Sequence, residues 1–163
     1  MMAEPRTYKL PLPPSANNYW AFGALRSRSY RGGKIPLTKA AKDFRDEVAV
    51  SVFYQNGRKP IPPFVGPCLI ECEIVWPDRR RRDSGNMPKQ LEDALQMAGV
   101  VLDDVQFVEH HYWVDLTRID SEGCVNVKVI PLDEDGTTSL TKPRKATVKQ
   151  RLTVGRKAVS SGR

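Results

Sequence analysis

Residues 68–76, CLIECEIVW, have an apolar side chain at every second position and glutamates between the central ones, a pattern typical of a β-strand. Every second position is apolar: Cys68, Ile70, Cys72, Ile74 and Trp76. Glu71 and Glu73 lie between them. Because successive side chains of a strand point to opposite faces, this run predicts a half-buried strand, with one face in a core and the other in solvent.

Two runs with helical spacing flank this strand. Thr38 is a suitable N-cap for a helix that ends near Gln55, and Asn56-Gly57 is a good stop. Its apolar stripe comprises Ala41, Phe44, Val48 and Val52. Asn86 is a suitable N-cap for the second helix, Pro88 fits its first turn and Gly99 ends it. Its buried face comprises Leu91, Ala94, Leu95 and Ala98.

The remaining segments predict further strands and loops. Residues 7–12 can form a first strand, and residues 107–118 and 123–131 are expected to form a final antiparallel pair. The proline-rich stretch 11–20, PLPPSANNYW, predicts a shaped loop, and the Gly-Gly turn within 26–37 predicts a hairpin or an extended arm. The element order predicts an α+β fold, with two helices packed on a small mixed sheet.

The positive charge is concentrated at the C-terminal end. The formal net charge is +7, yet residues 136–163 hold eight of the 26 basic residues and no acidic one. Residues 1–135 are therefore nearly neutral, with 18 basic and 19 acidic residues. We predict a folded domain over 1–131 and a basic extension over 132–163, which indicates an anionic partner.

The cysteines and the hydropathy pattern predict an intracellular protein. Cys68, Cys72 and Cys124 lack zinc-site spacing and are expected to be buried, reduced thiols. His110 and His111 have no partners at recognisable spacing, so no role is assigned to them. No apolar run approaches the roughly 20 residues that cross a bilayer, and no signal peptide is evident, so a cytoplasmic location is expected.

Four arginines, Arg79 to Arg82, run directly into Asp83. Asp83 lies before the second helix, and Asp103 and Asp104 lie after it, so a shared site requires the following strand to return beside the preceding one. If these carboxylates meet, hard oxygen ligands suit Mg²⁺ or Mn²⁺, and arginines suit a phosphate backbone. Taken alone, an arginine run is more often a solvated loop, and Asp-Asp after a helix is most often a turn.

Several segments, in order, resemble the RusA family of Holliday junction resolvases of bacteria and phages. The matching stretches are LPPSANNYW, LTKAAKDFRDEV, PDRRRRDSGNMPKQLEDAL and AGVVLDDVQ, within residues 7–131. The third resembles the family's basic run, its Asp-x-Asp-Asn motif and its following lysine. The resemblance implies a small α+β homodimer that nicks opposed strands of four-way DNA junctions with Mg²⁺ or Mn²⁺, and no small-molecule cofactor.

The resemblance also implies roles for individual residues. Asp83 and Asp104 correspond to metal ligands with Asp103 beside them, and Lys89 corresponds to the family's active-site lysine. The residues expected to contact DNA are Arg79, Arg80, Arg81, Arg82, Asn86, Lys89 and Asn17.

Gly85 departs from the family pattern, because it stands where the second motif aspartate is expected. We favour an inactivating change that leaves this chain nearly inactive. Alternatively, Asp103, Asp78 or Ser84 completes the site in a natural variant, or the protein binds branched DNA without cutting it. A structural protein of phage DNA processing, whose basic extension meets another protein, is a further alternative.

Overall fold

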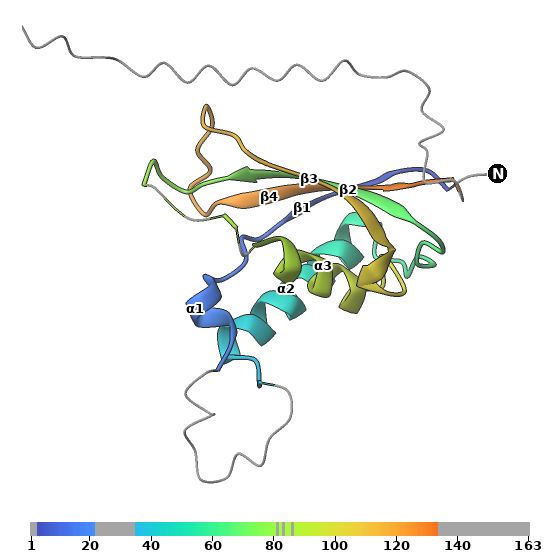
Figure 1. Cartoon of the computed structure of the whole chain (residues 1–163), viewed down its shortest axis with the longest axis horizontal. Helices are drawn as coiled ribbons and strands as arrows, with labels where there is room; N and C mark the ends of the chain where they lie inside the picture. The colour runs from blue at the N-terminus through green and yellow to red at the C-terminus, as the bar shows by residue number, and fades with distance from the viewer. Residues whose placement is uncertain (1–2, 22–34, 81, 83, 86, 134–163) are drawn as a thin grey trace, which may run out of the picture.

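The computed structural model describes residues 3–21, 35–80, 82, 84–85 and 87–133, which form an α+β domain. In chain order the elements are β1 (Arg6–Leu10), α1 (Ala16–Tyr19), α2 (Lys39–Gln55), β2 (Cys68–Val75), α3 (Met87–Met97), the 3₁₀ helix η2 (Asp104–Gln106), β3 (Phe107–Val114) and β4 (Cys124–Pro131). Both α2 and α3 lie on the same face of a four-stranded sheet (Figure 1). This confirms the predicted mixed sheet with two packed helices.

The strand order is β1-β4-β2-β3, with β2 and β3 parallel and the other neighbours antiparallel. The expected antiparallel pairing of the last two strands is wrong, because β4 lies between β1 and β2. In the register of the sheet, Cys72 of β2 stands opposite Val127 of β4 and Tyr112 of β3. The β2-α3-β3 unit is therefore a parallel crossover, which needs a long connection such as this helix.

Burial explains why β4 takes an inner position and β3 an edge. On the helix-covered side of β4, Val125, Val127 and Val129 are fully buried, and Ile130 is buried on the opposite side. That opposite side of β4 is mixed, because Asn126 and Lys128 are only partly buried there. Most β3 side chains are exposed, including those of 109–111 (Glu-His-His), and polar residues are common on edge strands.

The predicted bounds of α2 are confirmed. The Thr38 side chain accepts a hydrogen bond from the Ala41 backbone N–H at 3.1 Å, which satisfies one of the free donors of the first turn. The predicted apolar stripe is the buried face of the helix: Ala41, Phe44, Val48 and Val52. Asn56 is the C-cap and Gly57 follows at φ 70°.

The second helix also follows its local signals. Pro88 lies in the first turn of α3, and Gly99, at φ 72°, follows the end of the helix. Leu91, Ala94 and Leu95 are buried. The predicted N-cap, Asn86, lies outside the described residues.

The N-terminal loop contains more regular structure than its prolines suggest. Residues 16–19 form a one-turn helix, α1, so the prediction of a loop without a helix is wrong. The Asn18 N–H donates to the Ser15 carbonyl at 2.8 Å, and the Tyr19 ring is buried. Of the arm predicted over 26–37, residues 26–34 lie outside the described part; Leu37 forms a β-bridge with Trp20.

The three cysteines are buried and unpaired with one another, as predicted. Burial raises the pKa of the Cys72 thiol to about 12 and that of Cys68 to about 11. Both thiols therefore remain protonated and serve as core side chains. Within the described ranges, the helices are too short or too polar to cross a bilayer.

Candidate functional site

Lys89 and Asp104, 15 residues apart in the chain, form an ion pair. Lys89 lies in the first turn of α3, and Asp104 begins η2 at the entrance to β3. The Lys89 ammonium also lies 2.9 Å from Oδ1 of Asp93, one turn along α3. The Lys89 side chain is 61% exposed, whereas those of Asp93 and Asp104 are each 18% exposed. The structure thus brings together two predicted site residues, Lys89 and Asp104. The Lys89 ammonium is open to solvent, whereas the carboxylates that it contacts are mostly buried.

The turn that carries Asp104 is held by Gln106, which sequence reasoning did not single out. Its Oε1 accepts from the backbone N–H groups of Leu102 and Asp103, at 2.7 and 2.9 Å. Its Nε2 donates to the Phe64 and Gly66 carbonyls, at 3.0 and 2.7 Å. A side chain with four backbone bonds fixes the path of the chain. The capping-box spacing from Asp103 to Gln106 was a usable signal for this role.

Asp103 has a structural contact of its own. Its Oδ1 accepts from the Val105 N–H at 3.2 Å and caps η2. The side chain is exposed and adjoins Asp104 in sequence. Its role as an additional metal ligand stays a prediction.

The described arginines of the run differ in their environments. Both terminal nitrogens of Arg82 donate to Asp78, at 2.6 and 2.9 Å, and its guanidinium lies 5.4 Å from the Trp76 ring centroid. Arg79 and Arg80 are exposed, although the Arg80 Nε is 3.8 Å from Asp78. Arg82 therefore shapes the loop, whereas Arg79 and Arg80 remain accessible to an anion.

Asp78 should titrate far below an ordinary carboxyl group. Hydrogen bonds from Arg82 and from the Arg80 backbone lower its pKa to about 2. Arg82→Gln is expected to move this pKa toward about 4, the value of a free aspartate. Because the pKa is depressed on folding, this pairing stabilises the loop above about pH 4 and is lost as the pH falls toward 2. Carboxyl ¹³C NMR titration measures the shift; an unchanged pKa in Arg82→Gln would contradict the pairing.

The other predicted site residues divide between described and undescribed parts of the chain. Arg81, Asp83 and Asn86 lie outside the described residues, as does the side chain of Asn17. Ser84 accepts a backbone hydrogen bond from Met87 at 3.1 Å, and Gly85 is exposed. Within the described ranges, no three His, Cys, Asp or Glu residues are grouped so that they could hold a metal ion. The described part of the site offers the Asp104 carboxylate, a hard oxygen donor that fits Mg²⁺.

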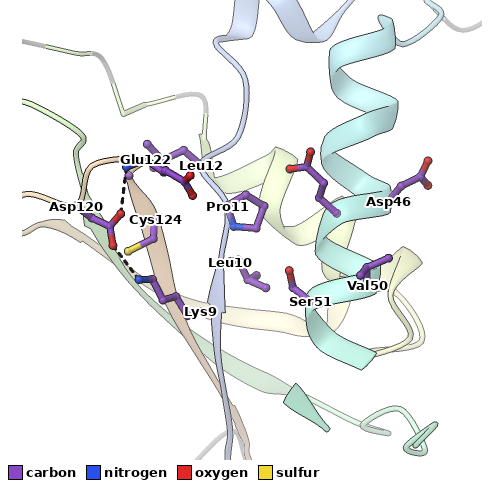
Figure 2. Close-up of a pocket in the computed structure, with 12 residues that line it drawn as sticks. Lys9, Leu10, Pro11, Leu12, Asp46, Val50, Ser51, Asp120, Glu122 and Cys124 are labelled. Carbon is purple, nitrogen blue, oxygen red and sulfur yellow. Dashed lines mark hydrogen bonds and ion pairs between the residues drawn. The ribbon is translucent and has the colours of Figure 1, made fainter. Parts of the chain in front are cut away.

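A groove of about 740 Å³ lies elsewhere, between β1, α2 and the segment that leads into β4. Figure 2 shows Lys9, Leu10 and Pro11 on one side and Asp46, Val50 and Ser51 on the other. The lining also includes Glu47, Asp120 and Glu122, and the Lys9 ammonium is paired with Asp120 at 2.8 Å. This acidic lining disfavours a DNA backbone, and none of the residues expected to contact DNA lines the groove.

Comparison with known proteins relates the chain to one family. No protein-family model matches it. It is 36% identical to the crossover junction endodeoxyribonuclease RusA of Escherichia coli strain K12 over 101 residues, which span 62% of this chain and 75% of that protein. It is 35% identical over 101 residues, with the same shares covered, to the proteins of that name from Enterobacteria phage 82 and Shigella sonnei strain Ss046.

The chain belongs to the RusA family of crossover junction endodeoxyribonucleases. This confirms the resemblance seen in the sequence motifs. RusA membership also gives the Lys89–Asp104 pair its significance, because the resemblance had assigned these two residues to an active-site lysine and a metal ligand. The structure shows them in contact; their roles remain predictions.

Proposed function

We propose that this protein resolves four-way DNA junctions by Mg²⁺-dependent phosphodiester hydrolysis, and that Gly85 impairs the chain as it stands. The observation that carries the proposal is the contact between Lys89 and Asp104 in a member of the RusA family. We further propose that it acts in the cytoplasm of a bacterial cell or phage-infected host. It would act as a homodimer, because a two-fold junction requires two symmetric cuts.

Different residues would bind the metal ion, stabilise the transition state and hold the DNA backbone in the proposed reaction. Asp104, with Asp83, would hold the metal ion, which supplies an activated water and offsets charge on the leaving oxygen. Lys89, exposed beside Asp104, can donate hydrogen bonds to a phosphate oxygen in the transition state. Arg79 and Arg80 can pair with the backbone of the bound strand, since their side chains are exposed. Manganese can replace magnesium at such an oxygen site.

The second candidate is a branched-DNA-binding protein that does not cut, and Gly85 is the observation that favours it. A cleavage assay separates the two functions. Four-way junctions and linear duplexes of the same sequence are incubated with Mg²⁺ and either the unaltered chain or Gly85→Asp. Resolution predicts paired symmetric nicks in the junction alone, abolished by Asp104→Asn or by chelation of the metal. Tight junction binding without nicks in either protein would favour the non-catalytic function.

The basic residues of 136–163 are proposed to strengthen binding without adding sequence specificity. Each lysine or arginine that neutralises a phosphate releases a counterion, so the slope of log affinity against log salt reports the number of contacts. Deletion of 136–163 is therefore expected to flatten this slope, by about 0.9 for each lost contact with duplex DNA. Fluorescence anisotropy over a salt series measures it, and an unchanged slope would show that the extension does not touch DNA.

A further inference from the structure

Asp93 links the Lys89 ammonium to the body of the domain. Its Oδ1 lies 2.9 Å from Lys89 Nζ, and its Oδ2 accepts from the Arg45 guanidinium at 3.0 Å. A carboxylate bound on both oxygens has little freedom to rotate. Asp93 therefore presents a fixed anion to Lys89, one helical turn further along α3.

Arg45 is itself held in place by Tyr19. Its Nε donates to the Tyr19 hydroxyl at 3.0 Å, and its guanidinium lies 5.7 Å from the Tyr19 ring centroid. Tyr19 is 1% exposed and makes an edge contact with Trp20. The series Tyr19–Arg45–Asp93–Lys89 thus runs from the core to a solvent-exposed ammonium and joins α1, α2 and α3.

A second pair in the same chain provides a comparison. Lys39 and Asp43 have the same i,i+4 spacing and an N–O distance of 2.6 Å, but their side chains are 88% and 50% exposed. Exposed helical pairs contribute little and do not hold one geometry. The Lys89–Asp93 pair differs because its carboxylate is covered and braced by Arg45. A lysine in the first turn is also repelled by the positive end of the helix dipole, and the negative charge of Asp93 offsets this repulsion.

We propose that Asp93 and Arg45 are positioning residues that aim the Lys89 ammonium at the Asp104 side of the site. This inference rests on the proposed function, in which Lys89 meets the phosphate. Neither residue touches DNA or metal in this scheme. They act by limiting where the long lysine side chain can place its charge.

The positioning can be tested without cleavage. The Lys89 ¹⁵Nζ resonance, read through its Cε protons and assigned by its absence in Lys89→Arg, reports the surroundings of the ammonium. Asp93→Asn and Arg45→Gln are expected to shift it, and Asp43→Asn, the matched control, is not. A Lys89 resonance unmoved by Asp93→Asn and Arg45→Gln in folded proteins would overturn the proposal.

Cleavage kinetics test the consequence in the Gly85→Asp background. Asp93→Asn is expected to lower kcat about 10- to 100-fold, the range for groups that support a metal site from outside, with KM changed less than about threefold. Asp93→Glu should recover part of this loss, and Asp93→Asn should add nothing once Lys89→Ala is present. Fully additive losses would show that Asp93 does not act through Lys89. If Gly85→Asp cuts no branched DNA, the proposed function fails, while the Lys89 resonance still decides the positioning.

Discussion

Gly85→Asp is expected to raise the rate of junction cleavage about 100-fold or more. An additional carboxylate beside Asp83 would raise the affinity for Mg²⁺ and fix the ion relative to the bound phosphate. Even groups that only support metal ligands change affinity or activity by roughly 10- to 100-fold, so a direct ligand should reach at least the upper end. Gly85 itself is exposed. Single-turnover nicking of a labelled four-way junction measures the gain.

The matched control for this gain is Gly85→Asn, which has nearly the same shape as aspartate but lacks its charge. It should remain close to the unaltered chain. In the Gly85→Asp background, Asp83→Asn and Asp104→Asn should each abolish nicking, while junction binding persists. If the unaltered chain already cuts as fast as Gly85→Asp, another oxygen ligand completes the site and Gly85 is not impairing.

Gly123→Ala is expected to destabilise the domain by about 2–5 kcal/mol. Gly123 has φ +72°, a left-handed conformation that costs roughly 1–2 kcal/mol for a residue with a Cβ. A Cβ there would lie 2.2 Å from Leu12 Cδ1 and 2.9 Å from Pro77 Cδ. Leu12 can move, but the proline ring is rigid, and forced overpacking adds about 1–3 kcal/mol. Urea unfolding followed by circular dichroism measures the change.

Gly99→Ala is the matched control for Gly123→Ala. Gly99 has the same φ of +72°, but a Cβ there would meet no atom within 4 Å. It should therefore show only the backbone cost, about 1–2 kcal/mol. Equal destabilisation at the two positions would mean that Leu12 and Pro77 accommodate the methyl group without cost.

The two long helices and the strand at 68–75 could be predicted because their signals are local. Thr38, the stripe from Ala41 to Val52 and Asn56-Gly57 specify one helix through contacts within about four residues. Alternation from Cys68 to Ile74 likewise identifies the buried face of β2. Strand pairing was predicted less well, since alternation gives the face of a strand but not its neighbour. The sequence therefore indicated that the segment now seen as β4 was a strand, but not that it lies between β1 and β2.

In the candidate site, too, the sequence predicted some features and only the tertiary structure revealed others. Motif order alone pointed to Lys89 and Asp104, and spacing could have added Asp93, because residues four apart share a helix face. Only the tertiary structure revealed that Lys89 reaches Asp104 and that Arg45 and Tyr19 stand behind Asp93. These contacts join segments 15 to 48 residues apart, so they depend on how α2 packs against α3 and on the path of the β2-α3-β3 crossover. The sequence by itself determined the two long helices, their apolar faces and the family. Packing between distant segments decided which charged side chains meet.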